Sequence, residues 1–404
     1  MQPLYILYDD LVIGLLTHTQ SGRLTFQYDS NWLGNVQAFP ISVSMPLGSD
    51  LFPDHVTRPY FSGLLPEGHI RETVARKLGI SPRSDFKLLQ CLGGDCAGAL
   101  VISDTLPLST EYAKEAIAQE DLSNILKTYT HQPFLVDHEG IRLSLAGAQE
   151  KLPIIYESNQ FYLPRGAPST HILKLPIAGY EDTVANEAFC LALAKAIGLN
   201  AVDAEIVTIG ETSYLLVERY DRIKTDGVWK RLHQEDMCQA LSIAPENKYQ
   251  QEGGPGIKAM IQLIKQHSHI PVKDIQQCMN QLIFSYYIGN RDAHGKNYSF
   301  VYQKEGLTLT PQYDVLRTEA YEQLSRKMAM KIGTCYDPDQ VSEKDWNLLA
   351  EENAINKTYL KNVREDIRSR IIGKMDSVID AIFKTVVPQV VLRERERILK
   401  TING

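Results

Sequence analysis

The segment Gly289-Asn290-Arg291-Asp292-Ala293-His294-Gly295-Lys296-Asn297, followed by Tyr313-Asp314, is the most informative part of this 404-residue chain. Asp292 and Asn297 have the spacing of the Asp and Asn in an Asp-x-x-x-x-Asn catalytic loop. Phosphoryl transfer needs a base that orients a hydroxyl group, oxygen ligands for Mg²⁺ and cations near the phosphates. In this interpretation Asp292 accepts the hydroxyl proton, and Asn297 and Asp314 supply oxygen ligands to Mg²⁺.

The competing interpretation is an ordinary loop with capping Asp and Asn side chains, because Asp-x-x-x-x-Asn alone is a common pattern. Asp314 follows the run Tyr298–Tyr302 and a return strand, which is where kinases place their metal-binding Asp. This second acidic residue favours phosphoryl transfer. His294 could contact a phosphate, but a single His in a polar loop is as often structural. The role of Lys296 is likewise left open.

A lysine lies in the middle of an apolar strand upstream of this segment. Lys174, in His171-Ile172-Leu173-Lys174-Leu175-Pro176, is costly to bury without a partner. Kinases place such a lysine against the ATP phosphates and pair it with a glutamate on the next helix. Glu187 lies on the next predicted helix. The alternative is a lysine on an edge strand whose ammonium group reaches solvent.

Two further segments fit the same order of elements. Glu218-Arg219-Tyr220-Asp221 follows an apolar strand, at the position of a hinge that would bind adenine. No G-x-G-x-x-G or Walker-type motif precedes Lys174. In its place stands Ser144-Leu145-Ala146-Gly147-Ala148-Gln149-Glu150-Lys151. Gly147 would let the backbone approach a phosphate, with Lys151 as a second cation, although this motif alone is weak.

The bulk properties indicate a globular protein with two or three packed units. Hydrophobic residues make up 44% of the chain and charged residues 23%, which excludes a disordered chain. The net charge of -7 argues against binding nucleic acid by bulk attraction, so DNA contact would come through a basic partner. The sequence shows neither a signal peptide nor a run of about 18 apolar residues. The six scattered cysteines lack metal-site spacing, so reduced thiols and a cytoplasmic location are expected.

Hydrophobic periodicity divides the chain into three expected parts. Residues 1–105 form a β-rich block, residues 106–225 mix strands with a helix over 183–197, and residues 226–404 are mainly helical. The expected strands include 4–8, 22–28, 41–45 and a hairpin of 152–156 with 160–164; the long expected helices lie near 256–267, 273–290 and 356–386. A strand-rich lobe followed by a helical lobe is the organisation of a bilobal kinase.

Taken together and in order, these motifs resemble the HipA family of serine/threonine kinase toxins. The resemblance extends into the first block and covers nearly the whole chain, with the fewest matches in the C-terminal third. It rests on residues 142–151, 171–176, Val217-Glu218-Arg219-Tyr220-Asp221-Arg222, Gln234-Glu235-Asp236-Met237-Cys238-Gln239, Asp292-x-His294-x-Lys296-Asn297, Leu64-Leu65-Pro66-Glu67-Gly68 and Asp95-Cys96-Ala97-Gly98-Ala99-Leu100.

The resemblance implies an α+β, bilobal protein-kinase-like fold of the PI3/4-kinase type, with an N-terminal β-rich subdomain and a helical C-terminal lobe. It implies Asp292 as the catalytic residue, Asn297 and Asp314 as metal ligands, and an ion pair between Lys174 and Glu187. Ser144 matches the serine that family members autophosphorylate, and the added negative charge would push the loop out of the nucleotide pocket as an off-switch. The implied nucleotide-binding residues are Ala146, Gly147, Ala148, Gln149, Glu150, Lys151, Lys174, Glu218, Arg219, Tyr220, His294, Gly295, Lys296, Asn297, Tyr313 and Asp314.

The resemblance also implies cofactors and partners. ATP and Mg²⁺ would be the cofactors, and the protein substrate would be an aminoacyl-tRNA synthetase, with the glutamyl enzyme as the first candidate, so that translation stalls. A HipB-like helix-turn-helix antitoxin would restrain the kinase and contact operator DNA, and no membrane is involved. The alternatives are a kinase-fold regulator that binds nucleotide with little phosphotransfer, and a small-molecule or lipid kinase.

Overall fold

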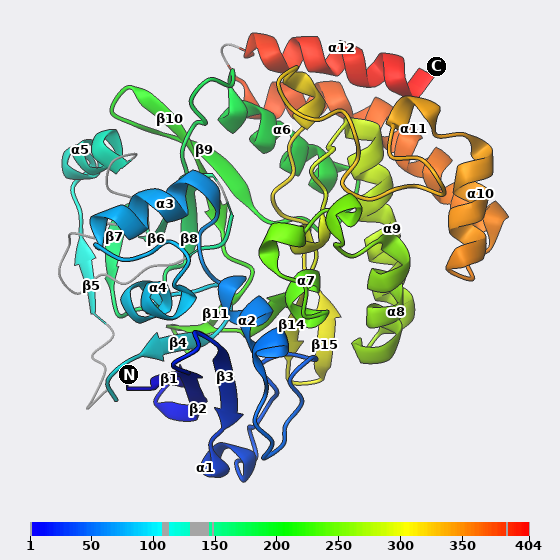
Figure 1. The fold of residues 1–404 in the computed structure, drawn as a ribbon. Helices are drawn as coiled ribbons and strands as arrows, with labels where there is room; N and C mark the ends of the chain where they lie inside the picture. The colour runs from blue at the N-terminus through cyan, green and yellow to red at the C-terminus, as the bar shows by residue number, and fades with distance from the viewer. Residues whose placement is uncertain (1, 107–112, 130–144, 148, 385–386, 404) are drawn as a thin grey trace. The chain divides into compact units, whose positions relative to one another are not determined.

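The computed structural model describes residues 2–106, 113–129, 145–147, 149–384 and 387–403. The chain forms two compact units, and its helices and strands are labelled in Figure 1. The first unit comprises residues 1–175, 208–246 and 301–303, and the second comprises 176–207, 247–300 and 304–404. These bounds differ from the three parts expected from the sequence, so that three-part division remains a prediction.

The first unit begins with an antiparallel sheet in the order β3-β2-β1-β4. Helix α2 contacts β3 and α4 contacts β4, so one face of the sheet is covered. Leu4, Ile6 and Phe26 point into this core and are fully buried. The elements are β1 (Leu4–Tyr8), β2 (Leu11–His18), β3 (Leu24–Tyr28), α1 (Ser30–Leu33), α2 (Asp54–Ser62), α3 (Gly68–Lys77), α4 (Asp85–Leu92) and β4 (Leu100–Ser103).

The prediction for this block was partly wrong. Strands 4–8 and 22–28 are present, but residues 41–45 form no strand and share only an isolated bridge between Ser42 and Met45. The backbone there is held by Glu235, whose carboxylate accepts bonds from Ser42 Oγ (2.5 Å) and Val43 N (2.9 Å). Helices α2, α3 and α4 accompany the strands of this block.

A second sheet, most of whose strands belong to the first unit, runs in the order β5-β7-β6-β8-β10-β9. Ser158 and Asn159 both have positive φ (51° and 62°), as a two-residue hairpin turn requires, and they connect β6 to β7 as predicted. Strand β8 pairs with β6 on one side and with β10 on the other. The elements are β5 (Ala113–Ala116), α5 (Gln119–Thr128), β6 (Lys151–Glu157), β7 (Gln160–Arg165), β8 (His171–Lys174), β9 (Ala204–Ile209) and β10 (Thr212–Glu218).

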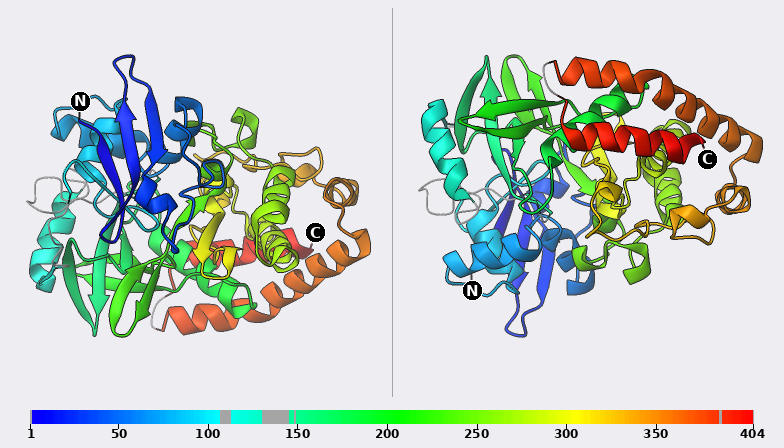
Figure 2. Two further views of the ribbon diagram at one scale, coloured as in Figure 1. Left: turned by 90° about the horizontal axis from the view of Figure 1, so that it is seen from below. Right: turned by 90° about the horizontal axis from the view of Figure 1, so that it is seen from above.

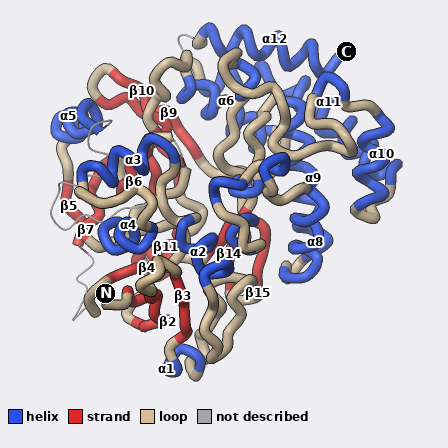
Figure 3. Tube along the Cα trace, viewed as in Figure 1, coloured by secondary structure: helices blue, strands red, loops and turns tan. Residues whose placement is uncertain are grey.

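The second unit is largely helical (Figure 3). Helix α6 is buried along most of its length and packs against α11 and α12 (Figure 2). The predicted helix over 356–386 ends at Ile382, and a separate helix, α12, begins after Pro388.

The remaining elements of the chain, in both units, are α6 (Thr183–Ala196), β11 (Arg222–Thr225), β12 (Val228–Arg231), β13 (Gln234–Asp236), α7 (Met237–Ala240), α8 (Ile257–His267), α9 (Pro271–Ile288), β14 (Ser299–Gln303), β15 (Gly306–Leu309), α10 (Glu343–Glu352), α11 (Lys357–Ile382) and α12 (Gln389–Asn403).

None of the described helices combines the length and the apolar composition that crossing a bilayer requires. The six cysteines are free thiols, and four of them are buried.

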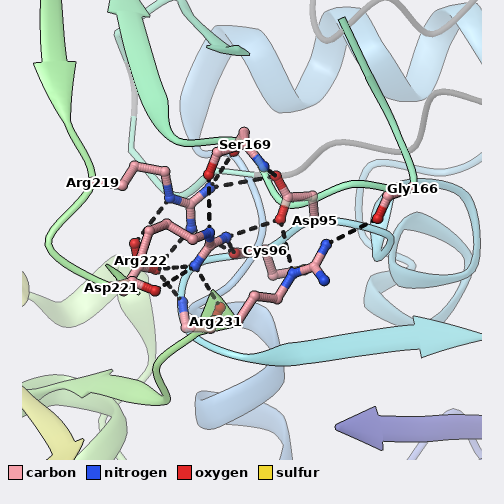
Figure 4. A network of polar contacts seen from close by, with 9 residues as sticks. Asp95, Cys96, Gly166, Ser169, Arg219, Asp221, Arg222 and Arg231 are labelled. Carbon is pink, nitrogen blue, oxygen red and sulfur yellow. Dashed lines mark hydrogen bonds and ion pairs between the residues drawn. The ribbon is translucent and has the colours of Figure 1, made fainter. Parts of the chain in front are cut away.

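A buried cluster of three arginines and two aspartates lies at the end of β10 (Figure 4). Arg219 binds Asp221 through two parallel bonds of 2.9 and 2.7 Å. Arg222 binds Asp95 at 2.9 Å and approaches Asp221 to 3.0 Å, and Arg231 lies 3.3 Å from Asp95. We call these five residues the arginine cluster.

The backbone completes the arginine cluster. Arg219 and Arg222 donate to the carbonyl oxygens of Cys96 and Gly98 (2.8 and 3.0 Å), and the Gly98 N–H donates to Asp221 at 2.6 Å. Burial alone would raise the pKa of Asp95, but the three arginines outweigh it and hold that pKa well below its ordinary value. The cluster therefore joins segments 95–98, 219–222 and 231 as a charged core.

We expect Asp95→Ala to lower the free energy of unfolding by about 3–5 kcal/mol, because it leaves buried guanidinium groups without a counter-charge. Urea unfolding followed by circular dichroism measures this. The matched control is Asp203→Ala, which removes a surface partner of Lys195 with a 70% exposed side chain and should change stability by at most about 1 kcal/mol. Equal unfolding midpoints for the two variants would contradict a structural role for the arginine cluster.

Candidate active site

The catalytic-loop segment of the second unit follows directly from the end of α9. Gly289 ends this helix with φ +74°, and a Cβ at this position would collide with Glu319 and Arg317 side-chain atoms. A glycine is therefore required for the chain to leave α9 and enter the loop. Asn290, the next residue, is buried, and its Oδ1 accepts the Asp292 N–H at 3.0 Å.

Three hydrogen bonds are accepted by oxygen atoms of Asp292. Its carbonyl accepts from Asn297 Nδ2 (3.0 Å) and from the His294 N–H (2.8 Å). Its carboxylate Oδ1 accepts the Tyr249 hydroxyl at 2.6 Å. The carboxylate is partly exposed, whereas His294, Lys296 and Asn297 are buried. The loop thus presents one carboxylate on a backbone that its own side chains fix.

Asp314 lies in a left-handed backbone conformation, with φ +56°. Such a conformation is costly for a non-glycine residue and is found often at functional sites. The preceding residue, Tyr313, donates its hydroxyl to the Lys296 carbonyl at 2.6 Å and lies 2.6 Å from Ser299 Oγ. The segment 313–314 is therefore attached to the catalytic loop, and the metal-binding role of Asp314 remains a prediction.

The oxygen atoms that Asn297 and Asp314 offer suit Mg²⁺ better than a cation that needs protein ligands on every side. The bond from Asn297 Nδ2 to the Asp292 carbonyl orients the amide, so Oδ1 is the atom offered to a ligand. Within the described ranges no three His, Cys, Asp or Glu side chains are placed to hold a metal ion. One carboxylate and one amide oxygen leave room for waters and phosphate oxygens, which Mg²⁺ usually keeps.

An ion-pair chain that the sequence did not predict lies behind the loop. Glu319 Oε2 accepts from Arg291 at 3.0 Å and approaches Arg317 to 3.2 Å. Arg317 also binds the buried Glu394 of α12 at 2.6 Å. Arg291 immediately precedes Asp292, so this chain fixes the loop from its buried side. Its other members, Arg317, Glu319 and Glu394, lie 26 to 103 residues from Arg291 in the sequence, and no local pattern marks them.

In the first unit, Gly147 and the residues at the start of β6 approach each other closely. Gly147 has φ +106°, and a Cβ there would lie 2.7 Å from Lys151 Nζ. Lys151 Nζ donates to the Ala146 carbonyl at 2.8 Å, and Gln149 Nε2 donates to the Leu175 carbonyl at 3.0 Å. Glycine therefore permits the close approach of a lysine ammonium group to this backbone segment.

Lys151 and Lys174 are directly opposite each other in the β6–β8 pairing. Residues paired in this way have side chains on the same face, with Cβ atoms about 5 Å apart. Both lysines are buried, with 8% and 6% of their surface exposed. Two like charges at this spacing repel each other, and the role of the pair in binding phosphate remains a prediction.

The predicted hinge residues lie at the end of β10. Glu218 is exposed, whereas the Arg219 side chain belongs to the arginine cluster and its N–H donates to the Thr170 carbonyl at 3.0 Å. Tyr220 donates to Gln234 Oε1 at 2.9 Å. These contacts give the segment a fixed backbone, and its adenine-binding role remains a prediction.

The other predicted site residues are divided between the units or lie outside the described residues. Glu187 is buried on α6 of the second unit, whereas Lys174 belongs to the first. Their ion pair therefore stays a prediction. Ser144 and Ala148 lie outside the described residues.

Comparisons with known proteins agree along the whole chain. The family model of the HipA N-terminal domain matches residues 4–103, and the family model of the HipA-like C-terminal domain matches residues 143–381. The chain belongs to the HipA family. The predicted family resemblance is thereby confirmed.

Relatives and a solved structure carry the same family name or a kinase name. A putative kinase of Sinorhizobium fredii, Y4mE, is 38% identical over 391 residues, covering 95% of this chain and 91% of the relative. The serine/threonine-protein kinase toxin HipA of Shewanella oneidensis is 31% identical over 346 residues, covering 82% and 79%.

The solved complex of Shewanella oneidensis HipA with HipB and operator DNA contains a chain that matches with a TM-score of 0.88 and 27% identity, covering 99% of this chain and 96% of that one. The predicted protein-kinase-like α+β fold is confirmed by this match to HipA. The family is one of serine/threonine kinase toxins.

We expect Lys174→Met to reduce the increase in melting temperature that ATP and Mg²⁺ produce, since a ligand stabilises only in proportion to its affinity for the folded state. Thermal denaturation with increasing ATP measures this. Lys230→Met on β12, where the lysine is exposed, is the matched control and should keep the wild-type increase. An unchanged increase in Lys174→Met would argue against the paired lysines as the phosphate site.

Proposed function

We propose that this HipA-family chain is an active, ATP- and Mg²⁺-dependent serine/threonine protein kinase that acts as the toxin of a toxin–antitoxin pair. The observation that carries the proposal is the catalytic loop itself. Asp292 presents a carboxylate held by Tyr249, and Asn297 is folded back onto the Asp292 carbonyl. Asp314 is attached to the same loop through Tyr313. This set of groups supplies the base and the metal ligands of phosphoryl transfer.

The reaction forms a bond between the substrate hydroxyl oxygen and the γ-phosphorus of ATP. The bond from that phosphorus to the β–γ bridging oxygen breaks, and ADP leaves with the electron pair. Asp292 accepts the hydroxyl proton. Asn297 and Asp314 would hold Mg²⁺, which neutralises the negative charge of the phosphates when bound. Lys151 and Lys174 would bind phosphate oxygens.

The proposed nucleotide contacts follow the sequence prediction. Residues 146–151 would form the loop over the phosphates, and residues 218–220 would bind adenine. His294, Gly295 and Lys296 lie on the catalytic loop, and Lys296 is held to Tyr313 through its carbonyl. We retain the division into residues 1–105, 106–225 and 226–404 as the proposed arrangement of subdomain, N-lobe and C-lobe.

The proposed partners rest on the family. The similar Shewanella protein was solved as a complex of HipA, HipB and operator DNA, and the net charge of -7 of this chain suits DNA contact through a basic partner. We propose a HipB-like antitoxin and, as the protein substrate, an aminoacyl-tRNA synthetase, with the glutamyl enzyme as the first candidate. Such a substrate would place the activity in the cytoplasm.

We expect the purified wild-type protein to incorporate γ-phosphate from labelled ATP into protein in the presence of Mg²⁺. Asp292→Ala should abolish the labelling, because the loop loses its base and the carboxylate that orients the hydroxyl group. Asp380→Ala, at an exposed position of α11, is the matched control and should label like the wild type.

The outcomes separate the alternatives. A wild-type protein that binds ATP but labels nothing would favour a regulator with a kinase fold. Transfer to small molecules or lipids, with no phosphoprotein in a cell lysate, would favour a different class of kinase.

We further expect mass spectrometry of the same incubation to find phosphate on Ser144 and on a synthetase of the lysate. Ser144→Ala should remove only the first signal and should prolong activity, because the added charge no longer repels the loop from the nucleotide. Phosphate on other residues of the chain, with none on Ser144, would contradict this switch.

A further inference from the structure

We propose that Tyr249 is a positioning residue for the proposed base, Asp292. This inference rests on the proposed kinase function and adds a residue that none of the sequence motifs singled out. The Tyr249 hydroxyl donates to Asp292 Oδ1 at 2.6 Å, a short bond typical of an O–H group that faces a carboxylate. The Tyr249 ring meets the His294 ring edge to face, with centroids 5.3 Å apart. One side chain therefore contacts two residues of the catalytic loop.

The backbone on both sides of this contact is bridged by a third segment. The Gln250 N–H donates to the Ala329 carbonyl (3.0 Å), and the Ala329 N–H donates to the Arg291 carbonyl (2.9 Å). The Gln250 side chain accepts from the Lys331 N–H at 2.9 Å. Residues 249–250 and 291–292 are thus held to the same strip of backbone, residues 329–331. The distance between Tyr249 and Asp292 is therefore fixed, because neither segment can shift without the other.

The turn that carries Tyr249 is closed on itself. The Tyr249 carbonyl accepts from the N–H groups of Glu252 and Gly254, both at 2.9 Å. A Cβ at Gly254 would lie 2.5–2.6 Å from backbone atoms of Asn247 and Lys248, so the turn has no room for a side chain there. A residue on such a rigid turn is suited to hold a neighbouring group in one orientation.

The bond has a direct chemical consequence for a general base. A carboxylate can rotate about its Cβ–Cγ bond, and only one rotational state directs a given oxygen at the substrate. With Oδ1 taken by the Tyr249 hydroxyl, Oδ2 is the oxygen that would receive the substrate proton.

Three further contacts surround this pair. Lys248 Nζ lies 5.7 Å from the Tyr249 ring centroid, and His294 packs against the same ring. Arg291 precedes Asp292 and is paired with Glu319. Removal of the Tyr249 hydroxyl alone keeps the ring that makes the contacts with Lys248 and His294.

The test is Tyr249→Phe, which removes the hydroxyl and keeps the ring against His294. We expect kcat for phosphate transfer to fall about tenfold or more, whereas KM for ATP changes less than about twofold. Tyr359→Phe on α11, where the tyrosine is exposed, is the matched control and should leave kcat and KM unchanged.

Values of kcat and KM for Tyr249→Phe equal to those of the wild type would overturn the positioning role while leaving the kinase proposal intact. A loss in kcat matched by an equal rise in KM for ATP would also overturn that role, because it would indicate a structural effect. A wild type that transfers no phosphate would overturn the kinase proposal itself.

Discussion

Three guanidinium groups and two carboxylates share a site from which water is excluded, and the first unit depends on how they are paired. Moving an ion from water into a protein interior costs several kcal/mol per ion, and attraction between ions repays it only when the geometry is good and the remaining donors are satisfied. Arg219 and Asp221 meet through two parallel bonds. Carbonyl oxygens of Cys96 and Gly98 accept further guanidinium donors.

This pairing fixes the chain where the proposed nucleotide site needs it fixed. Arg219 and Arg222 lie at the end of β10 and the start of β11, and both donate to Ser169, two residues before β8. Strand β8 carries Lys174, which faces Lys151 across the β6–β8 pairing. The start of β8, the strand that carries Lys174, is therefore anchored by a charged core. In the second unit, the ion-pair chain from Arg291 to Glu394 likewise anchors the loop that carries Asp292.

Local chemistry explains which features the sequence could predict. The β6–β7 hairpin follows from Ser158-Asn159, which accept positive φ, and the end of α6 follows from Gly198 with φ +83°. The spacing of Asp292, Asn297 and Asp314 was readable because phosphoryl transfer needs these side chains in a fixed order. The structure places them on one loop and its attached segment, in the second unit.

Long-range contacts explain the features that it could not predict. Residues 41–45 alternate like a strand, yet their backbone is shaped by Glu235, 192 and 193 residues away from Val43 and Ser42. Tyr249 gives no signal of its own, because its contact with Asp292 spans 43 residues. The sequence gives little indication of the arginine cluster either, because more than 120 residues separate Asp95 from the arginines that it binds.

The interleaving of the two units has a consequence for how the protein is made. The chain passes from one unit to the other at five places, and the first unit includes residues 301–303. About three quarters of the polypeptide must therefore leave the ribosome before that unit has all of its parts, so it cannot finish folding early during synthesis as a contiguous N-terminal domain can. For the same reason no single cut yields either unit as an intact fragment, and a nascent chain stopped in the catalytic region would expose incomplete portions of both.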